Sequence, residues 1–401
     1  VRSADQPERY RDFSGGLGMQ WNISEHDDFQ ASYAFDQYDK SDYQPITKLD
    51  IRDYSNVQNS LRLLYNHRFD RGDVLTIGSD FMHDYLYNTN LENETRNQNT
   101  WDLFGQYDWR ISDQWEAVGA VRYDYFSDGK ESHVTPKLNV CYKPIYNLSI
   151  RAGYGMGFRA PTLKEKYYNF DMAGIWIVEG NANLKSEVSH NFNLSAEYTK
   201  GHYNLTGSVY YNKVKNKLAT SVPYFKTPND KLPYLPYANL DDYSVCGGEI
   251  GAQAKWNNGL GARLTYAYTK EQLAKDKDGH TINNQYIPAR EHALNARVDF
   301  DKQLSKKYGL NIALQGRVLS GVENVEYKDY YDVSKGTITV EYPAYTIWKL
   351  SVVQRVGNAV KVTAALDNVF GYKPKYYYLN SPITDGVNFQ IGMSIDIDKL
   401  F

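Results

Sequence analysis

The sequence predicts an all-β protein, a transmembrane antiparallel β-barrel, and three observations support this fold class. Apolar and polar residues alternate along almost all of the 401 residues, and a period of two gives each strand one apolar and one polar face. Aromatic residues are abundant, with 37 Tyr, 15 Phe and 7 Trp. Short and long connections also alternate between the segments, as they do in bacterial outer-membrane barrels.

Composition excludes several other classes. No stretch approaches about 18 consecutive apolar residues, so we expect no transmembrane helix. A charged segment followed by an apolar one is missing from the N-terminus, so no secretory signal is expected in this sequence. The formal net charge is −3, and the lack of basic clusters argues against nucleic acid as a partner. Cys141 and Cys246 form neither a metal spacing nor a disulfide framework, so both are expected to be unpaired.

The alternation is clearest between Leu148 and Phe158, where every even-numbered residue is apolar. Such segments predict about 17 strands. In chain order they are 11–23, 28–38, 55–67, 73–87, 99–111, 114–126, 134–143, 147–158, 188–199, 202–215, 241–256, 259–271, 288–301, 308–319, 340–355, 358–371 and 386–400. A comparable stripe with a period of 3.6 residues is not found. The whole chain is therefore predicted to form strands.

The connections indicate how a barrel would sit in the membrane. Turn-forming residues mark short connections at 70–73, 112–113, 143–146, 200–201, 257–259 and 357–358. Longer connections lie between them, at 39–54, 88–98, 159–187, 216–240, 272–287 and 320–339. Short turns are periplasmic and long loops extracellular in outer-membrane barrels, which face lipid with apolar residues and the lumen with polar ones. The predicted lipid-facing residues include Leu148, Ile150, Tyr154, Leu194, Tyr198, Ile391 and Ile395, with Arg151, Glu197 and Asp396 on the other face.

The two ends of the chain set the orientation. Alternate apolar residues run from Phe389 to Ile397, and the chain ends in Phe401. A last strand that ends in an aromatic residue resembles the terminal signature of outer-membrane barrels. If that strand descends to the periplasm, strand 11–23 descends as well, and residues 1–9 lie outside. Since single-chain bacterial barrels have even strand numbers, we expect an N-terminal part of the protein to be missing from this chain.

Four short motifs carry a family resemblance. Residues 157–165, GFRAPTLKE, and residues 180–187, GNANLKSE, resemble the paired boxes of TonB-dependent outer-membrane receptors. Residues 365–370, ALDNVF, are similar to the segment of the penultimate strand in that family, and residues 247–249, GGE, resemble an element of a lumen-facing strand. The sequence departs from the second box at Ala182 and Ser186, where the family usually has proline.

The resemblance implies a barrel of about 22 strands plugged by an N-terminal globular domain. Residues 1–401 would then be the C-terminal part of the barrel, without the plug and the first five or so strands. Implied partners are the TonB–ExbB–ExbD complex, contacted through the missing plug, the N-terminal remainder of the same receptor, a surface lipoprotein and outer-membrane lipid. No permanently bound cofactor is expected.

The same resemblance implies active uptake of an iron complex, with haem placed first and cobalamin or a siderophore as alternatives. Loop 159–187 would handle the ligand. Haem receptors have a His between the boxes, whereas this interval offers Tyr and Met, which also serve as axial ligands. The candidate ligand-binding residues are Phe158, Arg159, Tyr167, Tyr168, Met172, Trp176, Asn181, Asn183, His133 and His280. His133 and His280 are placed on extracellular loops.

Each candidate also has a structural interpretation. Arg159 would either hold a carboxylate or phosphate of the ligand or pair with Glu165 or Glu187 within the loop. Aromatic and Met residues of the loop would either stack on a ligand or pack the loop itself. Two alternatives of other classes stay open: a passive porin-like channel, and a barrel enzyme or adhesin. No Ser/His/Asp set or carboxylate pair stands on a recognisable catalytic motif, so we expect no enzyme.

Overall fold

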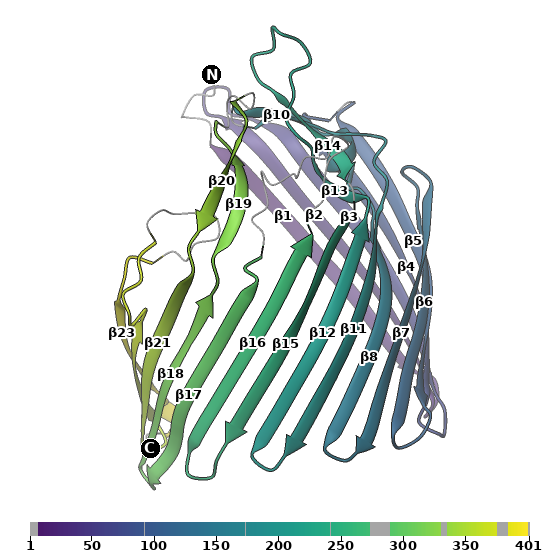
Figure 1. The fold of residues 1–401 in the computed structure, drawn as a ribbon. Coiled ribbons are helices and arrows are strands. Elements are labelled where there is room, and N and C mark those ends of the chain that lie inside the picture. Colours follow the sequence, from purple (N-terminus) through teal and green to yellow (C-terminus); the bar gives the residue numbers. More distant parts are fainter. Residues whose placement is uncertain are drawn as a thin grey trace.

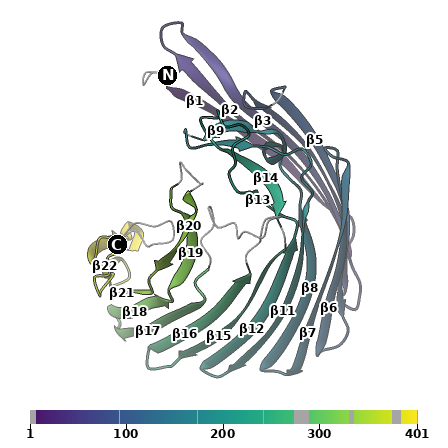
Figure 2. The same ribbon diagram turned by 45° about the horizontal axis from the view of Figure 1, so that its top comes forward.

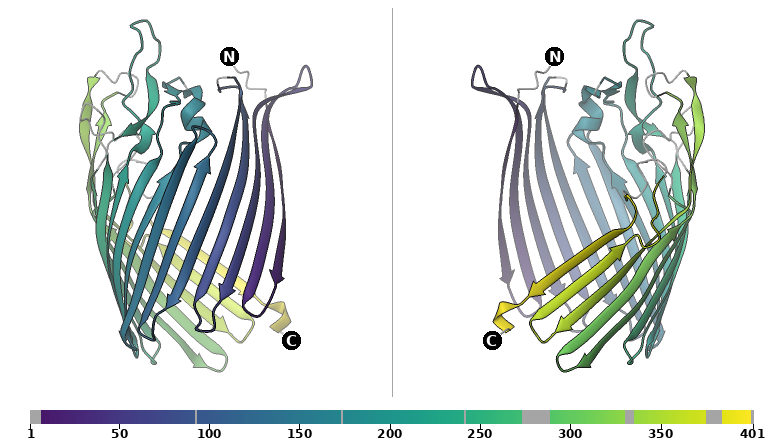
Figure 3. Two further views of the ribbon diagram at one scale, coloured as in Figure 1. Left: turned by 90° about the vertical axis from the view of Figure 1, so that its right-hand side faces the viewer. Right: turned by 90° about the vertical axis from the view of Figure 1, so that its left-hand side faces the viewer.

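The computed structural model describes residues 7–91, 93–172, 174–240, 242–272, 289–329, 335–374 and 384–399. Its main element is one 17-stranded sheet, in which strands that are consecutive in the wall pair in antiparallel register (Figure 1). The sheet curves into a barrel wall, and its edge strands β1 and β23 lie on either side of an opening (Figures 2 and 3). The predicted fold class, an antiparallel barrel with about 17 strands in this chain, is confirmed.

The wall strands are β1 (Glu8–Asn22), β2 (Asp27–Gln44), β3 (Leu49–Arg68), β4 (Val74–Asn88), β5 (Thr95–Arg110), β6 (Trp115–Phe126), β7 (Glu131–Ile145), β8 (Leu148–Arg159), β11 (Glu187–Lys200), β12 (Tyr203–Lys215), β15 (Tyr243–Lys255), β16 (Leu260–Gln272), β17 (His292–Ser305), β18 (Tyr308–Leu319), β21 (Tyr345–Val356), β22 (Val360–Asp367) and β23 (Asn388–Ile395). The remaining elements lie in the longer connections. They are α1 (Leu163–Tyr167), β9 (Asn169–Met172), β10 (Trp176–Glu179), β13 (Lys217–Thr220), β14 (Tyr234–Leu240), β19 (Val322–Tyr327) and β20 (Thr337–Tyr342).

The register places the apolar residues of neighbouring strands on one face. Leu148 pairs with Tyr198, and Leu194 with both Ala152 and Val209. The opposite face is polar, and on it Arg151 pairs with Glu197 at 3.5 Å. Loop 159–187 folds to the concave side of the wall (Figure 2), where residues 160–163 share a pocket with polar-face residues. The polar face is therefore the inner one, and the exposed apolar face is the outer one, suited to lipid.

Turn lengths at the two ends of the wall also follow the predicted alternation, except at the outer connections 45–48 and 127–130, which are short. The periplasmic-type connections, such as 201–202 and 306–307, are short, whereas 160–186 is long. Segment 39–54 was predicted as a long loop, but β2 and β3 continue through it and leave only the turn 45–48. The alternation did not reveal these extensions because strands that rise beyond the membrane need no apolar face.

The prediction of a single strand over 340–355 was wrong at its start. Residues 337–342 form β20, which pairs with β19 in a separate two-stranded sheet, and the wall strand β21 begins at Tyr345. Pro343 lies between the two strands and has no backbone N–H to donate to a ladder. The segment from 320 to 339, predicted as an irregular loop, therefore contains one strand of this hairpin and the start of the other.

The last two strands end earlier than predicted. Strand β22 stops at Asp367 because Asn368 adopts a left-handed conformation, with φ of 54°, which Asn tolerates better than most residues. The buried Asn368 amide donates to the carbonyls of Tyr372 and Gly386, so this part of the DNVF segment closes the connection to β23. Strand β23 ends at Ile395, and a 3₁₀ turn follows at Ile397–Lys399, so Asp396 lies beyond the strand. Phe401 lies outside the described residues.

The expectation that the chain would form strands throughout was also wrong at one place, since residues 163–167 form the short helix α1. Within the described residues, no helix has the length and apolar character needed to cross a bilayer. Cys141 and Cys246 are both free, as predicted.

Candidate functional site

The first family box folds into a turn and a short helix at the end of β8. Thr162 is the N-cap of α1: its hydroxyl accepts from the Glu165 amide, and the Glu165 carboxylate accepts from the Thr162 amide. This reciprocal pair is a capping box, which satisfies amide groups that a helix start leaves without partners. The helix therefore begins where the sequence supplies Thr and Glu three residues apart.

Arg159 joins the two family boxes. Its guanidinium donates to Glu165 of the first box at 2.9 Å and to Glu187 of the second box at 2.9 Å. The same group reaches the Leu218 carbonyl of the next loop at 3.4 Å. Guanidinium–carboxylate pairs of this kind are strong and directional. Of the two roles predicted for Arg159, the structure records the pairing within the loop, and we call the Arg159–Glu165–Glu187 group the rim clasp.

Helix α1 docks on the β6–β7 turn through a buried ion pair. The Lys166 ammonium is 4% exposed and donates to Asp128 at 2.8 Å. The Tyr167 hydroxyl donates to the other oxygen of the same carboxylate at 2.9 Å, and Arg96 lies over the Tyr167 ring. Beneath them, Leu163 packs with Leu86 and Leu91 in a small core. The loop is therefore held to the β4–β5 and β6–β7 connections and to the adjoining ends of β4 and β5.

The second box packs directly against this helix. Gly180 lies so close to α1 that an added Cβ would be 2.8 Å from the Lys166 carbonyl and the Tyr167 amide. The side-chain nitrogen of Asn181 donates to the Tyr237 carbonyl, and the side-chain oxygen of Asn181 accepts from the backbone amide of Asn183. Ser186, one of the two departures from the family pattern, is buried, donates to Glu131 and lies 3.1 Å from His133 Nε2. Asn181 and Ser186 therefore hold the loop in place.

Two outer loops share a four-stranded sheet in the order β13-β14-β10-β9. Strand β10 pairs in parallel with β14, which lies in the connection after β12. Trp176, Val178 and Leu235 form its buried core, with Phe170, Ile175 and Tyr237 packed against it. The box loop and the following loop therefore fold as one unit above the inner face (Figure 2).

The predicted binding residues divide into three groups. Phe158 lines an inner pocket, and Tyr167 and Tyr168 line an outer one. Met172 and Asn183 are exposed on the loop surface. Trp176 was predicted as a stacking surface, but it is only 6% exposed because it fills the core of the small sheet.

The two histidines of the prediction have separate outcomes. His133 was placed on a loop, but it belongs to β7, where its ring stacks on Phe158 at 4.3 Å between centroids. The pairing of β7 with β8 is recorded only from Lys137 downward, which leaves room for this stack above it. His280 lies outside the described residues.

The outer pocket has a volume of about 560 Å³ and lies between the β4–β5 turn and the box loop, with Asn90, Tyr168 and Glu179 in its lining. The inner pocket, of about 530 Å³, lies below the first box, where Pro161 and Thr162 meet Arg122 and Asp124 of the wall. Both volumes are typical of small-molecule sites. The first box therefore borders the inner pocket, and Gly180 and Ala182 of the second box border the outer one.

Sequence reasoning missed the charged wall residues in the inner pocket, Arg122 and Asp124, and those on the strands beside it. Arg122 donates to Asp102 at 2.7 Å and to Asp124 at 2.8 Å, and these two carboxylates are 2% and 3% exposed. Arg62 pairs with Asp80 at 2.7 Å on the next strands. We call this set of five residues the acidic wall. The sequence does contain a signal, because an Asp recurs on the polar face of consecutive strands. That these Asp residues are neighbours can be recognised only when the pairing register of the strands is known.

No cluster of His, Cys, Asp and Glu in the described part of the chain has the arrangement of a metal site. The side chains that line the two pockets offer hydrogen bonds, charge and aromatic contact to a ligand.

Comparison with known proteins gives a consistent picture. Residues 2–369 match the family model described as TonB dependent receptor-like, beta-barrel. The iron-regulated outer membrane virulence protein of Vibrio cholerae serotype O1 is 22% identical over 334 residues, which cover 80% of this chain and 49% of that protein. The vitamin B12 transporter BtuB of Photobacterium profundum is 21% identical over 350 residues, covering 85% of this chain and 52% of the transporter. The chain spans about half the length of these curated relatives.

Solved structures share the fold. The FrpB iron transporter from Neisseria meningitidis superposes with a TM-score of 0.73 and 16% identity, covering 97% of this chain and 63% of that one. A mutant of the ferric enterobactin receptor PfeA from Pseudomonas aeruginosa gives a TM-score of 0.72 and 16% identity, covering 91% of this chain and 57% of the receptor. At this identity the likeness concerns the fold.

Proposed function

This chain belongs to the TonB-dependent receptor-like β-barrel family, and on that premise we propose that it forms much of the wall of a receptor that takes up an iron complex by TonB-dependent active transport. Its location is the bacterial outer membrane. The proposed partners are TonB, ExbB and ExbD, which would act through a plug domain preceding this chain. The N-terminal remainder of the receptor and a surface lipoprotein are further proposed partners.

The observation that carries the proposal is the rim clasp. It joins both family boxes above the polar inner face, where each box lines one pocket. Binding sites favour loops that a rigid scaffold holds in position. A passive channel needs an open path for diffusion, whereas here two loops fold together over the inner face (Figure 2). The arrangement therefore favours a receptor that captures its ligand before transport.

Iron complexes are proposed as cargo because relatives and structural neighbours include an iron-regulated protein, an iron transporter and a ferric enterobactin receptor. Haem remains the specific candidate, ahead of cobalamin and of siderophores. Tyr167 is a weak candidate for an axial haem ligand. Burial and the hydrogen bond of Tyr167 to Asp128 raise the pKa of the phenol and disfavour the phenolate. Met172, which is 42% exposed on β9, is the better-placed candidate.

Growth on single iron sources tests the function. Cells that express the complete protein containing this chain, and that lack other receptors, are supplied with haem, a ferric catecholate or, in a cobalamin-requiring strain, cobalamin. We expect growth on an iron complex, and its loss when TonB is deleted. Growth that persists without TonB would favour the passive channel.

A matched pair of deletions tests the loop. Deletion of residues 166–178 removes α1 contacts and half of the small sheet but no wall strand, so the barrel should assemble while uptake falls sharply. Deletion of residues 225–231, at the tip of the neighbouring loop and outside both pockets, should affect uptake much less. Equal uptake by both variants would move the site away from the box loop.

Haem itself is tested by absorption spectroscopy on the purified complete protein. A Soret shift on titration, weakened in the Met172→Leu variant, is the expected result. If no shift occurs and cobalamin or a ferric siderophore binds tightly, haem is the wrong cargo and the receptor proposal stands with the other ligand.

A further inference from the structure

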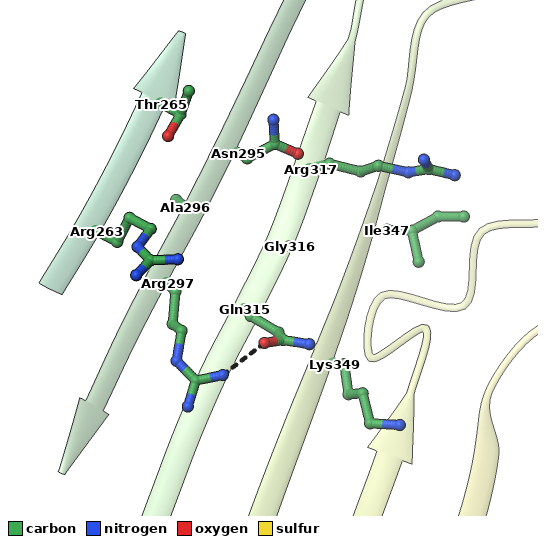
Figure 4. A pocket seen from close by; sticks show the side chains of 10 residues that line it. All are labelled: Arg263, Thr265, Asn295, Ala296, Arg297, Gln315, Gly316, Arg317, Ile347 and Lys349. Atoms are coloured by element: carbon green, nitrogen blue, oxygen red, sulfur yellow. Dashed lines mark hydrogen bonds between the residues drawn. The ribbon is translucent and has the colours of Figure 1, made fainter. Parts of the chain in front are cut away.

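The inner face carries a second charged region, far along the chain from the rim clasp. Arg263, Arg297, Arg317 and Lys349 come from four consecutive wall strands, β16, β17, β18 and β21 (Figure 4). They line a pocket of about 390 Å³ together with Thr265, Asn295 and Gln315. We call these four cations the basic cluster. None of these residues belongs to the family boxes or to the pockets at the rim.

Strand register brings the four cations together. Arg263 lies directly opposite Arg297, which pairs in turn with Gln315, and Gln315 pairs with Lys349. Arg317 lies two residues further along β18, in the next row of the same face. Like charges directly opposite each other destabilise an antiparallel pair. The Arg263–Arg297 pair therefore needs a compensating partner or a role that offsets its cost.

Compensation is incomplete. Arg297 has Asp299 at 2.9 Å, and Lys349 has Asp367 at 2.9 Å. Among the described residues, the recorded acceptor of Arg263 is the neutral Gln253 side chain, at 2.8 Å and 3.1 Å. Arg317 has the ring of Tyr345 at 5.9 Å. For Arg263 and Arg317, no carboxylate within ion-pair distance is recorded in the part of the chain that the structure describes, and both side chains are exposed on the inner face.

The neighbours of these arginines are suited to an anion. Thr265, Asn295 and Gln315 supply neutral hydrogen-bonding groups beside the guanidinium groups (Figure 4). Guanidinium forks match carboxylate and phosphate oxygens in pairs. A concave surface lined by one sign of charge also raises the local concentration of the opposite ion.

We propose that the basic cluster is a binding site for a small molecule that carries several carboxylate or phosphate groups, with Arg263 and Arg317 as its principal anion contacts. The site lies on the inner wall, apart from the rim, and does not depend on the identity of the transported cargo. An acidic segment of the same protein that covers the cluster would be a different occupant, and the test below separates the two.

The test is direct binding to the complete, detergent-solubilised protein that contains this chain. Tripolyphosphate and citrate serve as the phosphate and carboxylate probes, in calorimetric titrations at constant ionic strength. Saturable binding of at least one probe is expected. The Arg263→Gln/Arg317→Gln variant should weaken its Kd by about tenfold or more, because two charge-assisted contacts are lost.

Two further variants keep the result interpretable. Arg263→Lys/Arg317→Lys retains both charges but not the planar forks, so the Kd should lie between those of the wild type and the Gln variant. Arg151→Gln removes an inner-wall arginine that is already paired with Glu197 and should leave the Kd unchanged. No binding by the complete protein would overturn the proposal and favour a covered cluster. Binding that the Gln variant retains would overturn it as well, since the probe would then be held elsewhere.

Discussion

The inner face of the wall contains two charged regions that are built in opposite ways. In the acidic wall, the buried carboxylates of Asp102 and Asp124 share the guanidinium of Arg122. In the basic cluster, Arg263 and Arg317 are exposed and have no recorded carboxylate partner among the described residues. Both regions lie at the polar parity of consecutive strands. The difference between them is therefore one of compensation and not of position.

This difference separates charged groups that stabilise the fold, which we call structural charges, from charged groups that are available to bind a ligand. A buried carboxylate that loses its cation is left with an uncompensated desolvation cost. The arginine that neutralises such a carboxylate is therefore not available to bind a ligand. An exposed guanidinium without a carboxylate partner makes no such demand and can exchange water for an anion. The rim clasp belongs to the first kind, because Arg159 already holds two carboxylates of its own loop.

The largest effect is expected where compensation is complete. Arg122→Gln removes the cation shared by Asp102 and Asp124, and we expect the free energy of unfolding to fall by about 3–5 kcal/mol. Urea-induced unfolding of the protein in detergent or lipid measures it. Adding Asp102→Asn to the variant should recover part of the loss, since one buried charge is then removed.

The matched control is Arg151→Gln. Arg151 and Glu197 form a pair on the same inner face, but their side chains are 50% and 43% exposed. Exposed pairs contribute less than about 1 kcal/mol. If both Gln variants lose the same stability, burial does not distinguish the acidic wall, and the comparison fails.

The rim offers a second compensated pair outside the wall. Asp128→Asn takes the carboxylate away from the buried Lys166 ammonium and from the Tyr167 hydroxyl. We expect the docking of α1 to weaken by about 3 kcal/mol, with faster amide hydrogen exchange in residues 163–167 and little change in the wall strands.

Asp230→Asn is the control for that change, because the Asp230 carboxylate accepts hydrogen bonds from Thr227 within its own turn. It should leave exchange in residues 163–167 unaltered. A double change, Lys166→Met with Asp128→Asn, should restore part of the protection. Unchanged exchange in the single Asp128→Asn variant would show that the apolar contacts of Leu163 suffice to dock the helix.

A smaller effect is expected at Ser186. Its hydroxyl donates to Glu131, which is partly exposed and can accept from water instead. Ser186→Ala should therefore cost about 1 kcal/mol, seen as a small loss of protection at the start of β11. A loss as large as that of Asp128→Asn would mean that the serine, and not the ion pair, is the main link between loop and wall.

The wall could be predicted from the sequence because the face of a strand residue is set locally, by alternation with its neighbours. Leu194 and Arg151 were assigned to opposite faces on parity alone, and the register agrees. The extensions of β2 and β3 could not be predicted in this way. Above the membrane both faces meet water, so polar residues such as Asp39, Lys40 and Asp42 stand at both parities of segment 39–54 and obscure the alternation.

The site was less predictable because its contacts join distant segments. Trp176 is a residue type that often stacks on ligands, so the sequence alone suggested a binding role. Its burial depends on contact with Leu235, which belongs to another loop. The four cations of the basic cluster come from separate strands and form a group only when the register is known. Helix α1 did leave a local signal, Thr162 followed by Glu165 at capping-box spacing, but one turn is too short for a 3.6-residue period to appear.

The smallest change in stability is expected in the basic cluster. Arg263→Gln removes one of two guanidinium groups that face each other across β16 and β17, so unfolding should shift by less than about 0.5 kcal/mol, in the stabilising direction if repulsion with Arg297 dominates. Because salt screens that repulsion, raising the ionic strength should narrow the difference between the variant and the wild type. Urea unfolding at low and high salt measures both effects. A loss of more than about 1 kcal/mol in this variant would place Arg263 among the structural charges, in the same class as Arg122, and would leave the cluster without its most available cation.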